Sequence, residues 1–169
     1  MVADTRAASK RIGIRILFRV PVRASVVIVM SGLVQTVSAT PLAVADPIDD
    51  VRAGVTQMRG GSSCGGFRSD PLVERTAYLV NQSVDRWIDH TIRFPPIDNP
   101  LPLLKDLGYR GSKAAMGLGA SKNLGDAIKG MLLEGWAAIP DCSYTDYGVS
   151  ILLNKTKNEF LTAVVVAGA

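Results

Sequence analysis

Tyr147-Gly-Val-Ser-Ile-Leu-Leu-Asn-Lys-Thr-Lys-Asn-Glu-Phe-Leu-Thr-Ala-Val-Val-Val-Ala167 is the stretch of this chain that says most about its fold. Residues 147–153 alternate at first and then become apolar, residues 154–159 are polar, and residues 160–167 are again apolar. Two such runs around a polar turn predict an antiparallel β-hairpin. The β-branched valines near the end of the chain predict that the last strand lies inside the sheet rather than at its edge.

Three of the helices predicted upstream of this hairpin begin with the same signal. Asp46-Pro47, Asp70-Pro71 and Asn99-Pro100 each place an Asx side chain at the N-cap and a proline at the first helical position. The predicted ranges are 47–59, stopped by Gly60-Gly61, then a long helix from 71 that ends before Pro95-Pro96, and a short one over 100–107.

Two of these helices have a clear apolar stripe. In the first it consists of Ile48, Val51, Val55 and Met58. In the second it consists of Val73, Ala77, Val80, Val84, Trp87 and Thr91. Residues 114–119 predict a short buried strand, and residues 123–134 predict a fourth helix. Helices that come first and then mix with strands indicate an α+β fold with helices packed on an antiparallel sheet.

Residues 1–45 resemble a secretory signal peptide. Six basic residues precede an apolar run over 24–34, which is followed by Ala43-Val44-Ala45 with small side chains at the two cleavage positions, Ala43 and Ala45. Val37-Ser38-Ala39 is a second acceptable cleavage site, so cleavage after Ala39 stays open. The apolar run is shorter than the roughly 20 residues that span a bilayer, so a retained anchor is the less favoured alternative. The predicted location is extracellular or in the cell envelope.

Residues 46–169 are predicted to form one domain after cleavage. The chain contains 19 Lys and Arg against 15 Asp and Glu, and 13 and 14 of these fall in residues 46–169. The basic charge therefore belongs to the leader and does not indicate nucleic-acid binding. Cys64 and Cys142 both lie in the exported part, where two cysteines favour one disulfide, with two free thiols as the alternative. A single histidine and no CxxC pair argue against a metal site, and no cofactor is predicted.

The exported part resembles the CAP/SCP superfamily (cysteine-rich secretory proteins, antigen 5, pathogenesis-related 1), as a degenerate bacterial secreted member. The clearest match is Tyr144-Thr-Asp-Tyr-Gly-Val-Ser150, which resembles the family's Phe-Thr-x-Ile-Gly-Val-Gly strand. The weaker matches are Asp50-Val-Arg52, Leu72 with Ala77, Ala114-Ala-Met-Gly-Leu-Gly119, and Ala127-Ile128. The resemblance implies a three-layer α-β-α sandwich with a small sheet.

The family's cleft contains two histidines and two acidic residues, and some members bind a divalent metal there. The positions that resemblance makes equivalent are Val80 or Asn81 for the first histidine, Gly135 for the second (Ala137 with a small gap), and Ala114 for the strand glutamate. Glu134 remains as a counterpart of the other acid. The resemblance therefore implies a site that has lost its function.

Other candidate residues have a structural interpretation and a functional one. His90 is expected at the solvent-facing end of the second helix, with a role as base or ligand as the alternative. Asp85 and Asp89 are expected on a solvated face, although paired carboxylates can hold a cation. Cation binding is also the alternative for three acidic residues near the presumed cleft, Asp141, Asp146 and Glu134. Trp87 and Trp136 are both expected in the core, and Trp136 alternatively in a groove.

The predicted function is that of a secreted, non-catalytic domain that binds a ligand or a partner at the cell envelope. A lipid or another small apolar molecule is the ligand that the CAP resemblance suggests. The alternatives are an exported hydrolase, which titratable side chains in a cleft would favour, and a structural or adhesive surface protein. A nucleic-acid partner is not expected, a membrane is expected only through an uncleaved leader, and the oligomeric state stays open.

Overall fold

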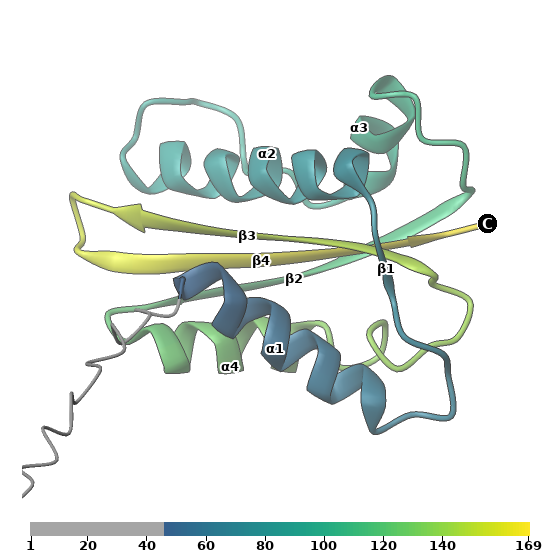
Figure 1. Ribbon diagram of the computed structural model, residues 1–169. Helices are drawn as coiled ribbons and strands as arrows, with labels where there is room; N and C mark the ends of the chain where they lie inside the picture. The colour runs from purple at the N-terminus through teal and green to yellow at the C-terminus, as the bar shows by residue number, and fades with distance from the viewer. Residues whose placement is uncertain (1–45) are drawn as a thin grey trace, which may run out of the picture. The chain divides into compact units, whose positions relative to one another are not determined.

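The polypeptide folds into three layers, with a sheet between two layers of helices (Figure 1). A computed structural model describes residues 46–169, which lie in one compact unit. The predicted signal peptide and its cleavage positions Ala43 and Ala45 lie outside the described residues. The elements are α1 (Pro47–Gly60), β1 (Arg68–Ser69), α2 (Pro71–Ile88), α3 (Pro100–Asp106), β2 (Lys113–Ser121), α4 (Leu124–Glu134), β3 (Asp146–Asn154) and β4 (Glu159–Gly168).

The α+β class and the sandwich architecture are confirmed. Helices α2 and α3 cover one face of the sheet, and α1 and α4 cover the other (Figure 1). The side chains of β4 alternate between these two faces. Val165 and Ala167 pack with Val73, Ala77 and Val80 of α2, whereas Val164 and Val166 pack with α1 and α4.

The strand order is β1-β3-β4-β2, and β4 is antiparallel to both of its neighbours. The prediction that the last strand lies inside the sheet is therefore confirmed. The sheet is not purely antiparallel, because β1 pairs with β3 in parallel at Arg68–Asp146 and Ser69–Tyr147. A two-residue strand shows no periodicity, so only the tertiary pairing and the ion pair of Arg68 with Asp146 (2.7 Å) define it.

The predicted helix starts are confirmed by their capping bonds. The side chains of Asp46, Asp70 and Asn99 each accept a backbone N–H from the first turn, and Asn123 caps α4 in the same way. These bonds satisfy donors that a helix start leaves without an intrahelical partner. Each cap therefore fixes the residue at which its helix begins.

Both tryptophans lie at the surface, so their predicted core positions are wrong. The side chain of Trp87 is 42% exposed and that of Trp136 is 66% exposed. Trp87 lies in the last turn of α2, which ends at Ile88. Helical periodicity predicts which face of a helix is apolar, but it does not say how completely other elements cover each position on that face.

The end of α2 is fastened to the β3–β4 turn by Asn154, which is fully buried. Its Nδ2 donates to Asp85 Oδ1 (2.8 Å) and Asp89 Oδ1 (2.9 Å), and its Oδ1 accepts the Lys157 N–H (2.8 Å). The bond from Asn154 is the main reason that the pKa of Asp89 lies below its ordinary value. Asp85 and Asp89 thus hold an amide in place.

Replacing Asn154 by alanine is expected to raise the pKa of Asp89 and to lower the urea midpoint of unfolding at pH 7. A carboxylate with a lowered folded-state pKa stabilises the fold above its unfolded-state pKa, and this stabilisation is lost as the pH falls through the folded-state value. The difference between the wild-type chain and Asn154→Ala should therefore shrink on acidification. Carboxyl ¹³C titration and urea unfolding at pH 7 and pH 3 measure both effects, and a pH-independent difference would contradict the assignment.

Candidate functional site

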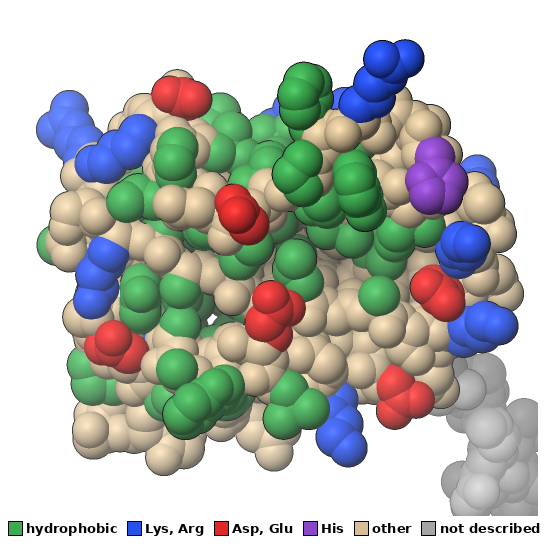
Figure 2. All heavy atoms as spheres, turned by 180° about the vertical axis from the view of Figure 1, so that it is seen from behind, with side chains coloured by type: hydrophobic (Ala, Val, Ile, Leu, Met, Phe, Trp, Pro, Cys, Tyr) green, Lys and Arg blue, Asp and Glu red, His purple; other side chains and the backbone are tan. Residues whose placement is uncertain are grey.

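A cavity of about 240 Å³ opens between α2 and the outer strand β2. We call it the edge pocket. Its lining consists of Asn81, Val84, Leu118, Gly119, Ala120 and Thr162. None of these side chains titrates near neutral pH, so the pocket offers shape and apolar surface rather than an acid, a base or a nucleophile. Figure 2 views the molecule from behind, where β2 borders the sheet, and shows hydrophobic side chains gathered on that face.

Asn81 is the main polar group of the edge pocket, and it is 1% exposed. Its Nδ2 donates to the Leu161 carbonyl (2.9 Å) and to Ser150 Oγ (3.3 Å), which holds the amide against the sheet. The Thr162 hydroxyl donates away from the pocket to the Ala127 carbonyl (3.0 Å). Polar chemistry in the pocket is therefore confined to one amide on an otherwise apolar wall.

The four positions that the CAP resemblance implies as counterparts of that family's site do not converge on one cleft. Val80 is fully buried against the sheet on the α2 side, and Ala114 packs with the same core on β2. Asn81 lines the edge pocket. Gly135 follows α4 on the opposite face, where its backbone lies close beneath Gly117. The sheet thus separates Gly135 from the other three positions.

The acidic residues near the presumed cleft are also dispersed. Asp141 accepts two bonds from Ser143, which lower its pKa, and it lies 4.0 Å from Lys113 Nζ. Asp146 is buried between Arg68 and the Tyr109 hydroxyl (2.7 Å), and burial together with that bond raises the pKa of Tyr109. Within residues 46–169, no three His, Cys, Asp or Glu side chains gather as metal ligands.

His90 lies outside these groups. It is exposed and follows α2 with a positive φ of 55°, a conformation that commonly terminates a helix. Glu134, in contrast, is engaged at the border of the sheet. Its Oε2 accepts the backbone N–H of Leu118 (2.7 Å), an N–H that points away from β4 and toward the free side of β2.

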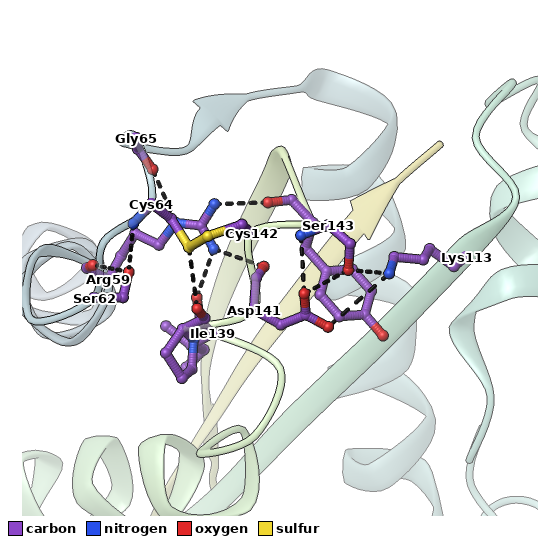
Figure 3. The surroundings of a disulfide bond; sticks show 11 residues. Arg59, Ser62, Cys64, Gly65, Lys113, Ile139, Asp141, Cys142 and Ser143 are labelled. Carbon is purple, nitrogen blue, oxygen red and sulfur yellow. Dashed lines mark hydrogen bonds and ion pairs between the residues drawn. A yellow bond between two sulfur atoms is a disulfide. The ribbon is translucent and has the colours of Figure 1, made fainter.

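A second structured region surrounds the disulfide between Cys64 and Cys142, whose Cα atoms are 5.1 Å apart (Figure 3). Arg59 at the end of α1 lies beside it and is only 4% exposed. Its guanidinium donates to four backbone carbonyls, those of Gly65 (2.9 Å), Ile139 (2.9 Å), Asp141 (2.8 Å) and Tyr144 (2.8 Å). Burial lowers its pKa.

Arg59 and the disulfide hold the same two segments, residues 61–66 and 139–144. The guanidinium also lies 4.1 Å from the centre of the Phe67 ring, which in turn stacks on Tyr147 at 5.5 Å. A cavity of about 160 Å³ adjoins this region. Sequence reasoning did not single out Arg59. The available signal was its position, four residues after Val55 on the apolar stripe of α1, where a cation is unexpected.

Comparison with known proteins adds one similarity of fold. No family model matches the chain, and no curated protein sequence matches it. Among solved structures, the chain is similar to an outer surface protein from Borrelia burgdorferi, with a TM-score of 0.57 and 12% sequence identity over 72% of this chain and 92% of that chain. At this identity the likeness concerns the fold alone.

Between residues 46 and 169, no helix combines the length and the hydrophobicity that crossing a bilayer requires.

Proposed function

We propose that this chain is an exported, non-catalytic binding domain that receives an apolar ligand in the edge pocket. The observation that carries the proposal is the lining of that pocket, which combines Val84, Leu118 and Ala120 with one buried amide and contains no titratable side chain. Pockets of this composition bind ligands by shape and burial, with the polar group orienting one end of the ligand.

A hydrolase would need a nucleophile with an adjacent base in a cleft, or a metal with an open coordination position. The candidate groups named from the sequence have other partners. Asp85 and Asp89 hold Asn154, Asp146 holds Arg68 and Tyr109, and the two cysteines are joined. These assignments favour binding over the hydrolase alternative.

The size of the edge pocket limits the ligand. At about 240 Å³ it is smaller than the roughly 300–1,000 Å³ typical of pockets that enclose a whole small molecule. A short acyl or branched apolar group fits this space better than an entire lipid does. The polar end of such a group would lie near Asn81.

An extracellular or envelope location is part of the proposal. It is supported by the cationic and apolar pattern of residues 1–45, by the disulfide, and by the fold shared with a protein named as an outer surface protein. Membership of the CAP/SCP superfamily is likewise proposed. The sequence resemblance and the sandwich of helices on a small sheet support it.

Replacing Ala120 by phenylalanine is expected to fill the edge pocket and to weaken ligand binding at least tenfold. The probe is 1-hexanol, a short apolar chain with one polar end, titrated into the full-length chain and followed by amide NMR. In the wild-type chain the largest shifts should occur at Leu118, Gly119 and Ala120.

Ala53→Phe is the matched control, because Ala53 is exposed on α1, on the opposite side of the sheet. Equal binding by the wild-type chain and Ala120→Phe would argue against the edge pocket as the site. Native mass spectrometry of the protein from its own culture medium gives a second reading. A stoichiometric divalent metal in that spectrum would contradict a site without metal chemistry.

A further inference from the structure

We infer that the partner of this domain is an extended polypeptide segment that adds to the free border of β2, with an apolar side chain in the edge pocket and basic side chains facing Glu134. The inference rests on the proposed function, because it uses the same pocket. It adds the chemical class of the partner and the backbone contacts that select it.

The outer side of β2 has hydrogen-bonding groups that no strand among residues 46–169 uses. The nine residues of β2 pair with β4 on one side, and no other strand among residues 46–169 pairs with its outer side. The bond from Leu118 N to Glu134 shows that the N–H of Leu118 points outward. Because strand residues repeat every two positions, the N–H groups of Ala114, Met116 and Ala120 point outward as well. Such a row of donors and acceptors matches an extended backbone.

One hydrogen-bond acceptor already occupies the outer border of β2. Glu134 places a carboxylate oxygen on the Leu118 N–H, where the carbonyl oxygen of an added strand would lie. An incoming peptide carbonyl can take over this N–H, so the exchange leaves no backbone donor unsatisfied. Glu134 is then released to pair with a cation of the peptide. Within the described residues Glu134 makes no ion pair of its own, so its carboxylate can pair with a cation of the peptide.

The side chains of a strand added to β2 would point alternately to the two faces of the sheet. The edge pocket lies on the α2 face, because Asn81 and Val84 of α2 line it. Glu134 reaches the border from α4, on the other face. A peptide with alternating apolar and basic residues therefore meets the pocket on one side and the carboxylate on the other.

The surroundings of Glu134 suit such basic side chains. Leu133 and Trp136, its near neighbours in sequence, are 62% and 66% exposed. An indole face attracts Lys and Arg, and an apolar surface covers their methylene stems. Figure 2 shows that hydrophobic side chains are exposed on this face of the molecule, together with acidic and basic ones. The charge and the exposed apolar groups thus favour a basic peptide over an acidic one.

The experiment uses the full-length chain and the capped peptide Val-Lys-Val-Lys-Val-Lys-Val, with tryptophan fluorescence and amide NMR as readouts. Ala120→Pro deletes one outward N–H and no bond of the ladder to β4, and proline is tolerated at a sheet edge. We expect this variant to bind the peptide at least tenfold more weakly. The same peptide with alternate backbone amides N-methylated should lose binding to the wild-type chain, a comparison that does not depend on the folding of a variant.

Glu134→Gln tests the charge. It should weaken binding of the lysine peptide about fivefold and leave unchanged the binding of Val-Ser-Val-Ser-Val-Ser-Val. Asp50→Asn, which removes an exposed charge from α1, is the matched control and should change neither. Equal weakening of both peptides by Glu134→Gln would overturn the ionic part of the inference.

The outcomes separate this inference from the proposed function. Binding of 1-hexanol without binding of either peptide would overturn the inference and leave the proposed function standing, whereas failure of both probes would overturn both. Unaltered peptide binding by Ala120→Pro, or by the N-methylated peptide, would show that the border of β2 is not used. A concentration-dependent dimer that Ala120→Pro abolishes would identify a second copy of the chain as the occupant and overturn the basic-peptide assignment.

Discussion

Replacing Arg59 by methionine is expected to lower the free energy of unfolding by about 4 kcal/mol, a large fraction of what a domain of this size possesses. The guanidinium satisfies four carbonyls at once, and these belong to Gly65, Ile139, Asp141 and Tyr144. A carbonyl that loses a charged donor costs about 1–3 kcal/mol, reduced where water can reach it. Methionine retains the apolar stem and so isolates the loss of the hydrogen bonds.

Arg52→Met is the matched control on the same helix. Arg52 forms ion pairs with Asp49 (3.4 Å) and Glu74 (2.6 Å), but its side chain is 38% exposed. Exposed pairs contribute about 0–1 kcal/mol, so the control should change stability by no more than that. Urea unfolding of both variants measures the difference. Equal losses would show that the four carbonyls find other donors when Arg59 is removed.

Combining Arg59→Met with removal of the disulfide tests whether the hydrogen bonds of Arg59 and the disulfide contribute to the free energy of unfolding in a coupled way. The disulfide closes a loop of 78 residues, for which chain entropy predicts about 4 kcal/mol. Because the Arg59 hydrogen bonds and the disulfide both join residues 61–66 to residues 139–144, we expect a coupling energy of about 1 kcal/mol or more between them. Strict additivity of Arg59→Met and Cys64→Ser/Cys142→Ser would mean that each holds its segments independently.

Replacing Gly119 by alanine is expected to destabilise the fold by about 3 kcal/mol, because α4 packs directly against the backbone of β2. A Cβ at Gly119 would overlap the Ala127 carbonyl oxygen and approach Met131 N and Thr162 Oγ1. Two of these atoms belong to the backbone of α4, so the helix itself would have to move. The shift would also disturb the edge pocket, which Gly119 lines.

Gly130→Ala is the control for this variant. Gly130 faces Gly119 from α4, but a Cβ there would lie 3.5 Å from the Gly119 Cα, an ordinary contact. Replacing a glycine inside a helix by alanine favours the helix by roughly 1 kcal/mol. Thermal unfolding should therefore show opposite signs for the two variants. Destabilisation by both would mean that the interface between α4 and β2 tolerates no added methyl group on either side.

Local features of the sequence predicted most of the elements. Asp46, Asp70 and Asn99 marked the helix starts because a short polar side chain before proline satisfies backbone donors that need no tertiary partner. The polar turn of residues 154–159 and the apolar runs around it marked the hairpin for a similarly local reason. These signals operate within a few residues, so they can be read without the rest of the fold.

Features that depend on distant residues were predicted less well. Trp87 lies on the apolar stripe of α2, yet its side chain is 42% exposed, because helical periodicity does not specify which positions other elements cover. The parallel strand β1 exists only because Arg68 and Ser69 meet β3. The counterparts that the CAP resemblance implies, Val80, Asn81, Ala114 and Gly135, depend on spacing along the chain. Spacing does not say on which face of a sheet a residue lies.

The amino-acid order by itself determined where the four helices begin, which helix faces are apolar, and that the last predicted strand lies inside the sheet, because capping and periodicity act over short distances along the backbone. Only the tertiary structure decided that Arg59 donates hydrogen bonds to four carbonyls and that Asn81 and Leu118 line one pocket. It also decided that one side of β2 stays unpaired within residues 46–169. Those contacts join residues far apart in sequence, and no local preference specifies them.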